Sequence, residues 1–216
     1  MLVVQGDPAA TAQNIQAHEL LYRSGLAAHL VVTTTNVPLA VIFYELFKVV
    51  NRRLALLDAC FILVATAIEA AGLLNQFAPL ALLGDGAYAS ALPPSQLQAL
   101  AALPGDLASV DYTIHTVFFG LDILIFAYLV LRSGFLPSAI GVLLAIDGLA
   151  YLCYSFTDIL APDAATHLVP WIQLPALVGE GALCLWLLVV GLDVDRWNQQ
   201  RSRATQLQST HLEALP

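Results

Sequence analysis

Apolar residues gather along this chain in five long stretches, each about as long as a helix that crosses a bilayer. Roughly twenty apolar residues span a hydrocarbon core about 30 Å thick, because an α-helix rises about 1.5 Å per residue. A helix also satisfies its own backbone hydrogen bonds where no water is available. The pattern therefore predicts an all-α fold, an integral membrane helical bundle with five transmembrane helices: 25–47, 54–77, 107–131, 136–160 and 171–192.

The segments around these stretches are more polar. Asp7 followed by Pro8 is typical of a helix N-cap with proline at the first helical position, and it predicts an N-terminal interfacial helix. Residues 92–106 contain proline near both ends and predict a short separate helix in the second connection. We expect a single transmembrane domain over 1–194 and a polar cytoplasmic tail over 195–216.

Composition supports a membrane protein and gives it an orientation. The chain is 59% hydrophobic and 11% charged, whereas about a quarter of the residues are charged in an ordinary soluble domain. Its net charge of −8 leaves no basic patch for nucleic acid. Most lysines and arginines lie in the first and third connections or in the tail: Lys48, Arg52, Arg53, Arg132, Arg196, Arg201 and Arg203. Because positive residues stay cytoplasmic, we expect the N-terminus outside and the C-terminus in the cytoplasm.

Polar residues recur at helical spacing within all five stretches. Positions i, i+4 and i+7 share one face of a helix, and a lipid-exposed carboxylate costs about 2.5 to 3.5 kcal/mol on insertion scales. These polar positions should therefore turn toward a shared interior. They are His29, Thr33 and Asn36; Asp58, Glu69 and Gln76; Asp111, His115 and Asp122; Asp147, Tyr151, Tyr154 and Asp158; and Gln173, Glu180 and Cys184.

Asp122 and Asp147 are the most notable of these polar residues. The turn between the third and fourth spans centres near Ser133 and Gly134, and the two aspartates are about equally far from it on antiparallel helices. If both face inward, they lie at one level near the bilayer midplane. Two carboxyls close together in a low dielectric cannot both ionise cheaply, so we expect them to share a proton.

Structural roles compete with functional ones at each position. A single intramembrane aspartate often makes a neutral interhelical hydrogen bond. For Asp122 or Asp147 taken alone, this structural role is as good an explanation as a functional one. Asp58 and Glu45 lie near the arginines of the first connection and should be solvated or salt-bridged, and Asp111 should lie at the membrane interface. A packing role is the simpler interpretation for the histidines and tyrosines: His29, His115, Tyr151 and Tyr154.

Known cofactor and metal motifs are missing from the sequence. Carboxylates with His29 and His115 could suit a divalent cation, but there is no HExxH motif and no paired ExxH motif. We find no glycine-rich phosphate loop, no GxSxG elbow and no dinucleotide fingerprint. The sequence predicts no cofactor and no metal.

Four segments carry a resemblance to a known family: GDPAATAQNIQAHELLYRSG, YELFKVVNRRLALLDACF, VFFGLDILIFAYLVLRSGFLPSAIGVLLAIDGLAYL and GEGALCLWLLVVGL. They resemble bacterial domain-of-unknown-function family 4386 over nearly the whole chain. The resemblance implies a helical integral protein of the bacterial inner (cytoplasmic) membrane, but no established activity. Family members have a further hydrophobic helix before the first segment, so the resemblance implies that this chain lacks the family's first helix.

The sequence favours a membrane enzyme that performs acid/base chemistry on a lipid-soluble substrate, as an isomerase, a cyclase or an epoxide-opening hydrolase. A buried protonated carboxyl can act as general acid beside a carboxylate base. The candidate catalytic residues are Asp122, Asp147, Glu69 and Glu180. The candidate substrate-binding residues are Tyr151, Tyr154, Asp158, His115, His29 and Asn36.

Two other functions stay open. The same carboxyls could form the relay of a proton-linked transporter or a cation pathway, although no inverted repeat or pair of broken helices is visible. The chain could instead be a noncatalytic subunit of a membrane complex, in which neutral acids hold helices together. The expected partners are membrane lipids, a hydrophobic small-molecule substrate, and other copies in a homo-oligomer or a larger membrane complex.

Overall fold

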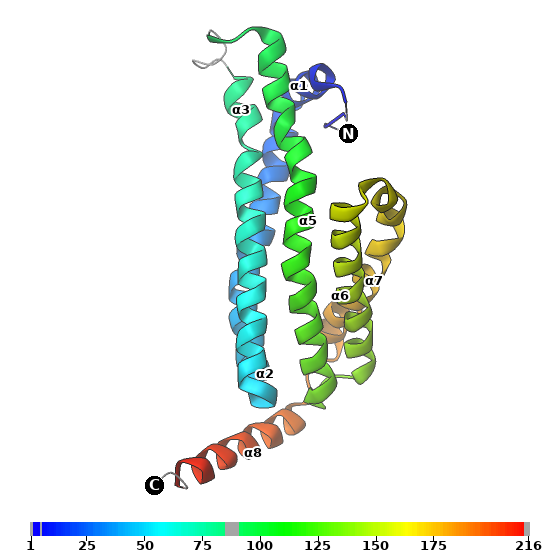
Figure 1. Ribbon diagram of the computed structural model, residues 1–216. Coiled ribbons are helices and arrows are strands. Elements are labelled where there is room, and N and C mark those ends of the chain that lie inside the picture. Colours follow the sequence, from blue (N-terminus) through cyan, green and yellow to red (C-terminus); the bar gives the residue numbers. More distant parts are fainter. Residues whose placement is uncertain (1, 5, 85–90, 214–216) are drawn as a thin grey trace. The chain divides into compact units, whose positions relative to one another are not determined.

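The structure is a computed structural model that describes residues 2–4, 6–84 and 91–213 (Figure 1). The described residues form helices and short connections without a β-strand, so the predicted all-α fold is confirmed. Of the predicted tail, residues 214–216 lie outside the described part. The helices are α1 (Pro8–Ala17), α2 (Glu19–Asn75), α3 (Ala78–Leu82), α5 (Pro94–Ser133), α6 (Ser138–Leu160), α7 (Pro162–Val189) and α8 (Val194–Glu213).

Four helical stretches in the described part of the chain are long and apolar enough to cross a membrane: Glu19–Leu82, Pro94–Ser133, Ser138–Leu160 and Trp171–Val189. They support a membrane location, and their exposed apolar side chains are suited to contact with lipid. The number of five spans, the interfacial position of α1 and the orientation of the chain stay predictions.

The first of these stretches is 64 residues long and bends where the sequence predicts a connection between two spans. Asn51 leaves the helical conformation, with φ −155° and ψ 105°. Its side-chain oxygen accepts hydrogen bonds of 3.1 Å from the backbone N–H groups of Arg53 and Leu54. Asparagine thus caps the start of the second arm of α2, because its side chain replaces a missing backbone acceptor.

Two predicted boundaries differ from the structure. Residues 92–106 were expected to hold a separate short helix, but α5 begins at Pro94 and continues through Pro104 into the apolar stretch. The polar segment after Val194 forms a helix, α8, that the sequence analysis did not predict. At the N-terminus the prediction is confirmed: Pro8 opens α1, and the Asp7 carboxylate accepts a hydrogen bond of 2.9 Å from the Ala10 N–H.

The chain divides into two compact units, and each is described here by itself. Unit 1 contains Met1–Val37 and Thr66–His115, and unit 2 contains Pro38–Ala65 and Thr116–Pro216. Both α2 and α5 contribute residues to both units. The single transmembrane domain over residues 1–194 stays a prediction.

Unit 2 has an aromatic core where the bend of α2 packs on the end of α5. The fully buried ring of Phe47 lies 5.0 Å from that of Phe126 and 5.5 Å from that of Phe135, between ring centroids. Phe43 packs 4.7 Å from Phe126. Helices α6 and α7 lie side by side in the same unit (Figure 1). This packing fixes the helices that carry most of the predicted site.

Candidate functional site

Close contacts at glycine set the spacing of α5, α6 and α7 around the predicted site. A Cβ atom on Gly148 of α6 would lie 2.9 Å from the carbonyl oxygen of Gly120 on α5. A Cβ atom on Gly179 of α7 would lie 3.2 Å from the backbone of α6. Small residues let membrane helices approach this closely. Asp147 and Glu180 directly neighbour two of these glycines in sequence, so their side chains start from closely packed backbones.

Asp147 on α6 meets Glu180 on α7. Asp147 is fully buried, and none of the described N–H or O–H groups donates to either of its carboxyl oxygens. The Glu180 carboxyl lies near enough to interact with it. A hydrogen bond between the two carboxyls would require that one of them be protonated, because a carboxylate is only an acceptor. The Tyr151 hydroxyl also donates to Glu180 Oε1 at 3.2 Å.

Asp122 on α5 meets Asp58 on the second arm of α2 in the same way. The two residues are 6% and 4% exposed, and their carboxyls lie near enough to interact. The Oδ1 atom of each has no partner among the described residues. A hydrogen bond within this second pair would likewise require a proton on one carboxyl.

The charge of Glu180 acts on Asp122 as well as on Asp147, so the two pairs form one group. We call it the carboxyl cluster: Asp58, Asp122, Asp147 and Glu180. It draws one carboxyl from each of α2, α5, α6 and α7. No lysine or arginine occurs within the five apolar stretches, so protons or a bound cation must compensate the charge.

The carboxyl pairs in the structure differ from the pair that the sequence predicts. The sequence predicted a pair of Asp122 with Asp147, whereas in the structure Asp58 interacts with Asp122 and Glu180 interacts with Asp147. Asp58 was expected to be solvated or salt-bridged near the arginines of the first connection, which is wrong because the residue is buried. The depth of each carboxyl along its helix did not determine its partner; the rotation of the helix did.

A signal for Asp58 was present in the sequence. Its neighbours three and four positions away are Leu54, Ala55, Phe61 and Ile62. These positions share one face of a helix with Asp58, and none carries a charge that could pair with it. A carboxyl on an apolar face is directed toward the interior unless a neighbouring cation reaches it.

A second group of polar residues forms within unit 1. His29 Nε2 lies 2.8 Å from Glu69 Oε1, and the side chains are 36% and 19% exposed. The charges of His115, Glu69 and His29 all act on Asp111. We call these four residues the histidine–carboxyl cluster. Glu69 was predicted as a catalytic residue with Asp122 and Asp147, and in the structure it contacts His29 in this cluster.

Gly72 allows Asp111 to reach the histidine–carboxyl cluster. A Cβ atom on Gly72 would lie 2.1 Å from Oδ2 of Asp111 and 2.2 Å from its carboxyl carbon. Any side chain at this position would displace the carboxyl, since contacts this short do not occur between unbonded atoms. Asp111 was expected at the membrane interface, and the structure packs it against α2.

Three further candidates are half-buried. Asn36 is half-buried in unit 1, and Tyr154 and Asp158 are half-buried on α6 in unit 2. Tyr154 and Asp158 each take part in an interaction with another residue. Cys184, expected on the polar face of its span, is exposed. Across the described residues, no three histidine, cysteine, aspartate or glutamate side chains are arranged to hold a metal ion.

The fold and these clusters define an all-helical protein with membrane-spanning character and buried carboxyl groups. The family described as "Domain of unknown function (DUF4386)" matches residues 1–191, and the chain belongs to this family. No curated protein matches the chain. No solved structure matches it either.

Proposed function

We propose that this protein is an acid/base enzyme that acts on a lipid-soluble substrate and that the carboxyl cluster is its catalytic centre. The observation that carries the proposal is the pairing of carboxyl with carboxyl, twice, without a cationic side chain. Each pair holds a proton that titrates with the pair rather than with one residue. A protonated carboxyl beside an ionised one supplies a general acid and a general base at once.

Glu180 is the member of the cluster that reaches the substrate in this proposal. It is half-buried, while Asp58, Asp122 and Asp147 are buried. Its helix is apolar and few of its residues are buried, so a substrate dissolved in the bilayer can approach it from the side. Asp147 lies behind Glu180 and exchanges protons with it, and Tyr151 orients the Glu180 carboxyl.

The reaction class follows from what a proton-sharing cluster can do. In an isomerisation, Glu180 donates a proton to one carbon of a double bond, and a carboxylate of the cluster removes a proton from a neighbouring carbon. The substrate keeps its composition, and the cluster ends with the number of protons it began with. Cyclisation of a polyene or opening of an epoxide would begin with the same proton donation.

Proton-linked transport is the second candidate. The observation that favours it is the linkage of the two pairs through Glu180 and Asp122, which gives a series of four proton sites across four helices. Carboxyl series of this kind mark proton relays in membrane proteins. Transport also requires a wet route to both membrane faces, whereas the enzyme requires only access from the bilayer.

The first experiment is difference infrared spectroscopy of the purified protein in detergent, comparing wild type with Asp122→Asn, Asp147→Asn and Glu180→Gln. We expect a protonated-carboxyl band at neutral pH that changes in all three variants. Glu69→Gln is the control, because Glu69 belongs to the other cluster, and it should leave this band in place. A wild-type protein without any protonated-carboxyl band at neutral pH would falsify the proposal.

A second experiment separates the two functions. The protein in lipid nanodiscs is incubated in deuterated water with polyene and epoxide lipids, and mass spectrometry measures product formation and deuterium uptake. The enzyme predicts product that decreases at least about a hundredfold in Glu180→Gln, since general acid/base groups contribute roughly 10²- to 10⁴-fold. Proton flux into dye-loaded liposomes without product would support the transporter instead.

A further inference from the structure

Cationic side chains concentrate in unit 2 around the bend of α2 and the first turns of α8. They line two adjoining cavities among the described residues, with volumes of about 570 and about 480 Å³. The cations are Lys48, Arg52, Arg132, Arg201 and Arg203. These are five of the eight lysines and arginines of a chain whose net charge is −8. Glu45 is the one carboxylate that lines either cavity, so this region is locally positive.

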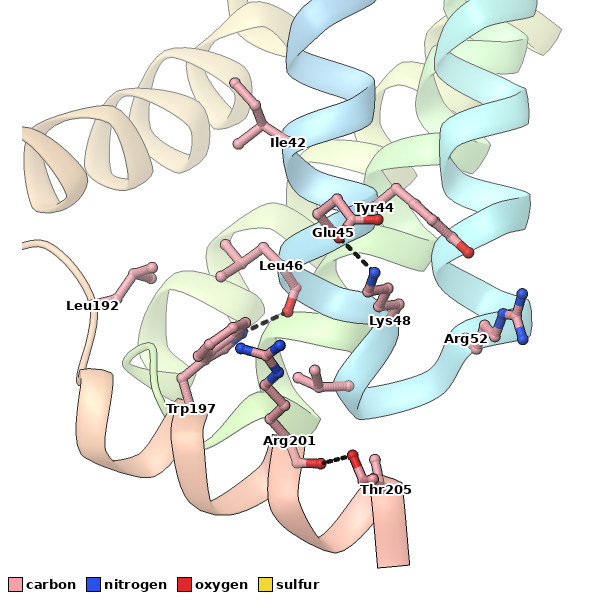
Figure 2. Close-up of a pocket in the computed structure, with 12 residues that line it drawn as sticks. Ile42, Tyr44, Glu45, Leu46, Lys48, Arg52, Leu192, Trp197, Arg201 and Thr205 are labelled. Atoms are coloured by element: carbon pink, nitrogen blue, oxygen red, sulfur yellow. Dashed lines mark hydrogen bonds and ion pairs between the residues drawn. The ribbon is translucent and has the colours of Figure 1, made fainter. Parts of the chain in front are cut away.

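The larger cavity combines an apolar wall with this positive charge. Figure 2 shows it between α2, which contributes Ile42 and Leu46, and α8, which contributes Trp197 and Arg201. Arg52 lines it from the second arm of α2, beyond the bend. Its volume lies within the range of about 300 to 1,000 Å³ that is usual for small-molecule sites. An occupant would contact aliphatic carbon on one side and cationic groups on the other.

Hydrogen bonds hold α8 in place as one wall of this cavity. The Trp197 indole N–H donates to the Leu46 carbonyl oxygen at 3.0 Å, and Arg196 Nη1 donates to the Gly134 carbonyl oxygen at 3.0 Å. Gln200 donates to the Ser133 carbonyl oxygen. Because these hydrogen bonds fix α8, the cavity is part of the tertiary structure of this chain.

Most of these cations have no anionic partner within the described chain. Lys48 pairs with Glu45, and the Arg201 guanidinium lies 5.5 Å from the Trp197 ring centre. None of the ion pairs among described residues includes Arg52, Arg132, Arg201 or Arg203. Arginine presents several N–H donors in a planar fork that matches a phosphate group, so unpaired arginines around a cavity favour a phosphate ligand.

The geometry points to a binding site for the headgroup of an anionic phospholipid in the cavity between α2 and α8. Arg52 and Arg201 both line the cavity and would attract the phosphate, and Ile42 and Leu46 would contact the first part of an acyl chain. The apolar wall and the neighbouring apolar helices favour a lipid over a free anion. Basic pockets beside membrane-spanning helices bind anionic lipids in this way, and tryptophan is enriched at that depth. This site is independent of the proposed catalytic function.

The test measures quenching of Trp197 fluorescence by lipids with brominated chains. Trp171→Phe and Trp186→Phe leave Trp197 as the single tryptophan. The protein in detergent is titrated with brominated phosphatidylglycerol and, separately, with brominated phosphatidylcholine. We expect the anionic lipid to quench at about tenfold lower concentration, because each basic residue near an anionic headgroup adds several-fold to its affinity.

Arg52→Gln combined with Arg201→Gln should reduce this preference to less than about twofold. Arg53→Gln is the matched control: Arg53 is exposed, adjacent to Arg52 in sequence, and lines neither cavity. Native mass spectrometry of the otherwise wild-type chain, which counts bound phosphatidylglycerol, repeats the comparison if the single-tryptophan protein does not fold.

Two outcomes overturn the inference. An equal loss of preference in Arg53→Gln would mean that general surface charge, not this cavity, attracts the lipid. Displacement of the anionic lipid by excess inorganic phosphate would mean that the cavity takes a free anion. Retention of the preference in the presence of phosphate, together with its loss only in the Arg52/Arg201 variant, supports the lipid site.

Discussion

The carboxyl cluster and the histidine–carboxyl cluster place similar acidic groups in different surroundings. In unit 1, Glu69 is partly exposed and lies 2.8 Å from a histidine nitrogen. In unit 2, Asp147 is fully buried and meets only another acid, Glu180, among the described polar groups. One carboxyl has a basic partner and some access to solvent, and the other has neither.

This difference separates an ordinary ion pair from a group that must hold protons. A histidine can compensate Glu69 without any change in the number of protons on the carboxyl. Asp147 and Glu180 lack a basic partner, so a hydrogen bond between them requires a proton on one of the two carboxyls. The carboxyl cluster therefore suits proton exchange, and the histidine–carboxyl cluster suits a stabilising role.

Asp147→Asn should produce the largest change, an increase of about 2 kcal/mol in the free energy of unfolding. The amide supplies an N–H donor to Glu180 without the need for a shared proton, and it removes one carboxyl from a buried pair of acids. Equilibrium unfolding of the purified protein in mixed micelles, with increasing dodecyl sulfate, measures this. A loss of stability would show that Asp147 is well compensated in the native protein. That result would contradict the contrast between the carboxyl cluster and the histidine–carboxyl cluster.

Gly72→Ala should lower the free energy of unfolding by about 1.5 kcal/mol, because the added methyl group displaces the Asp111 carboxyl from the histidine–carboxyl cluster. The same unfolding measurement applies. Gly25→Ala is the control, since a Cβ atom there would meet nothing within 4 Å. The loss should disappear when Gly72→Ala is made in an Asp111→Ala background; if it persists there, the contact with Asp111 is not its cause.

Glu69→Gln should lower the free energy of unfolding by about 1 kcal/mol, opposite in sign to Asp147→Asn, because it removes the partner of His29. Glu19→Gln is the matched control. Glu19 pairs with Arg23 at an exposed position, with side chains 53% and 55% exposed, so its loss should change stability little. Equal effects of the two substitutions would mean that the His29 pair contributes no more than a surface ion pair.

Tyr151→Phe should have the smallest effect, a loss of about 0.5 kcal/mol, because the hydroxyl makes a long hydrogen bond of 3.2 Å to Glu180. The phenylalanine ring keeps the edge contact with Phe119. Tyr128→Phe, at an exposed position, is the control. A shift of the protonated-carboxyl infrared band in Tyr151→Phe alone would place the hydroxyl within the proton-sharing group. An unchanged band would assign Tyr151 to packing.

Local sequence signals predicted the helical elements well but not all of their boundaries. The bend at Asn51 coincides with the predicted first connection, because an asparagine cap is encoded by nearby residues. Helix α8 was missed because its residues are polar and its contacts are distant in sequence, such as Trp197 with Leu46. The sequence also did not predict that residues 94–106 continue into the rest of α5, because proline was interpreted as the end of a helix.

The sequence by itself determined that this chain is a helical membrane protein with carboxyl groups in its apolar stretches. That information is local, because about twenty successive apolar residues suffice to identify a span. Only the tertiary structure decided that Asp122 meets Asp58 and that Asp147 meets Glu180. Side chains turn by about 100° per residue around a helix, so the partner of a carboxyl depends on helix rotation and on close contacts such as that at Gly148.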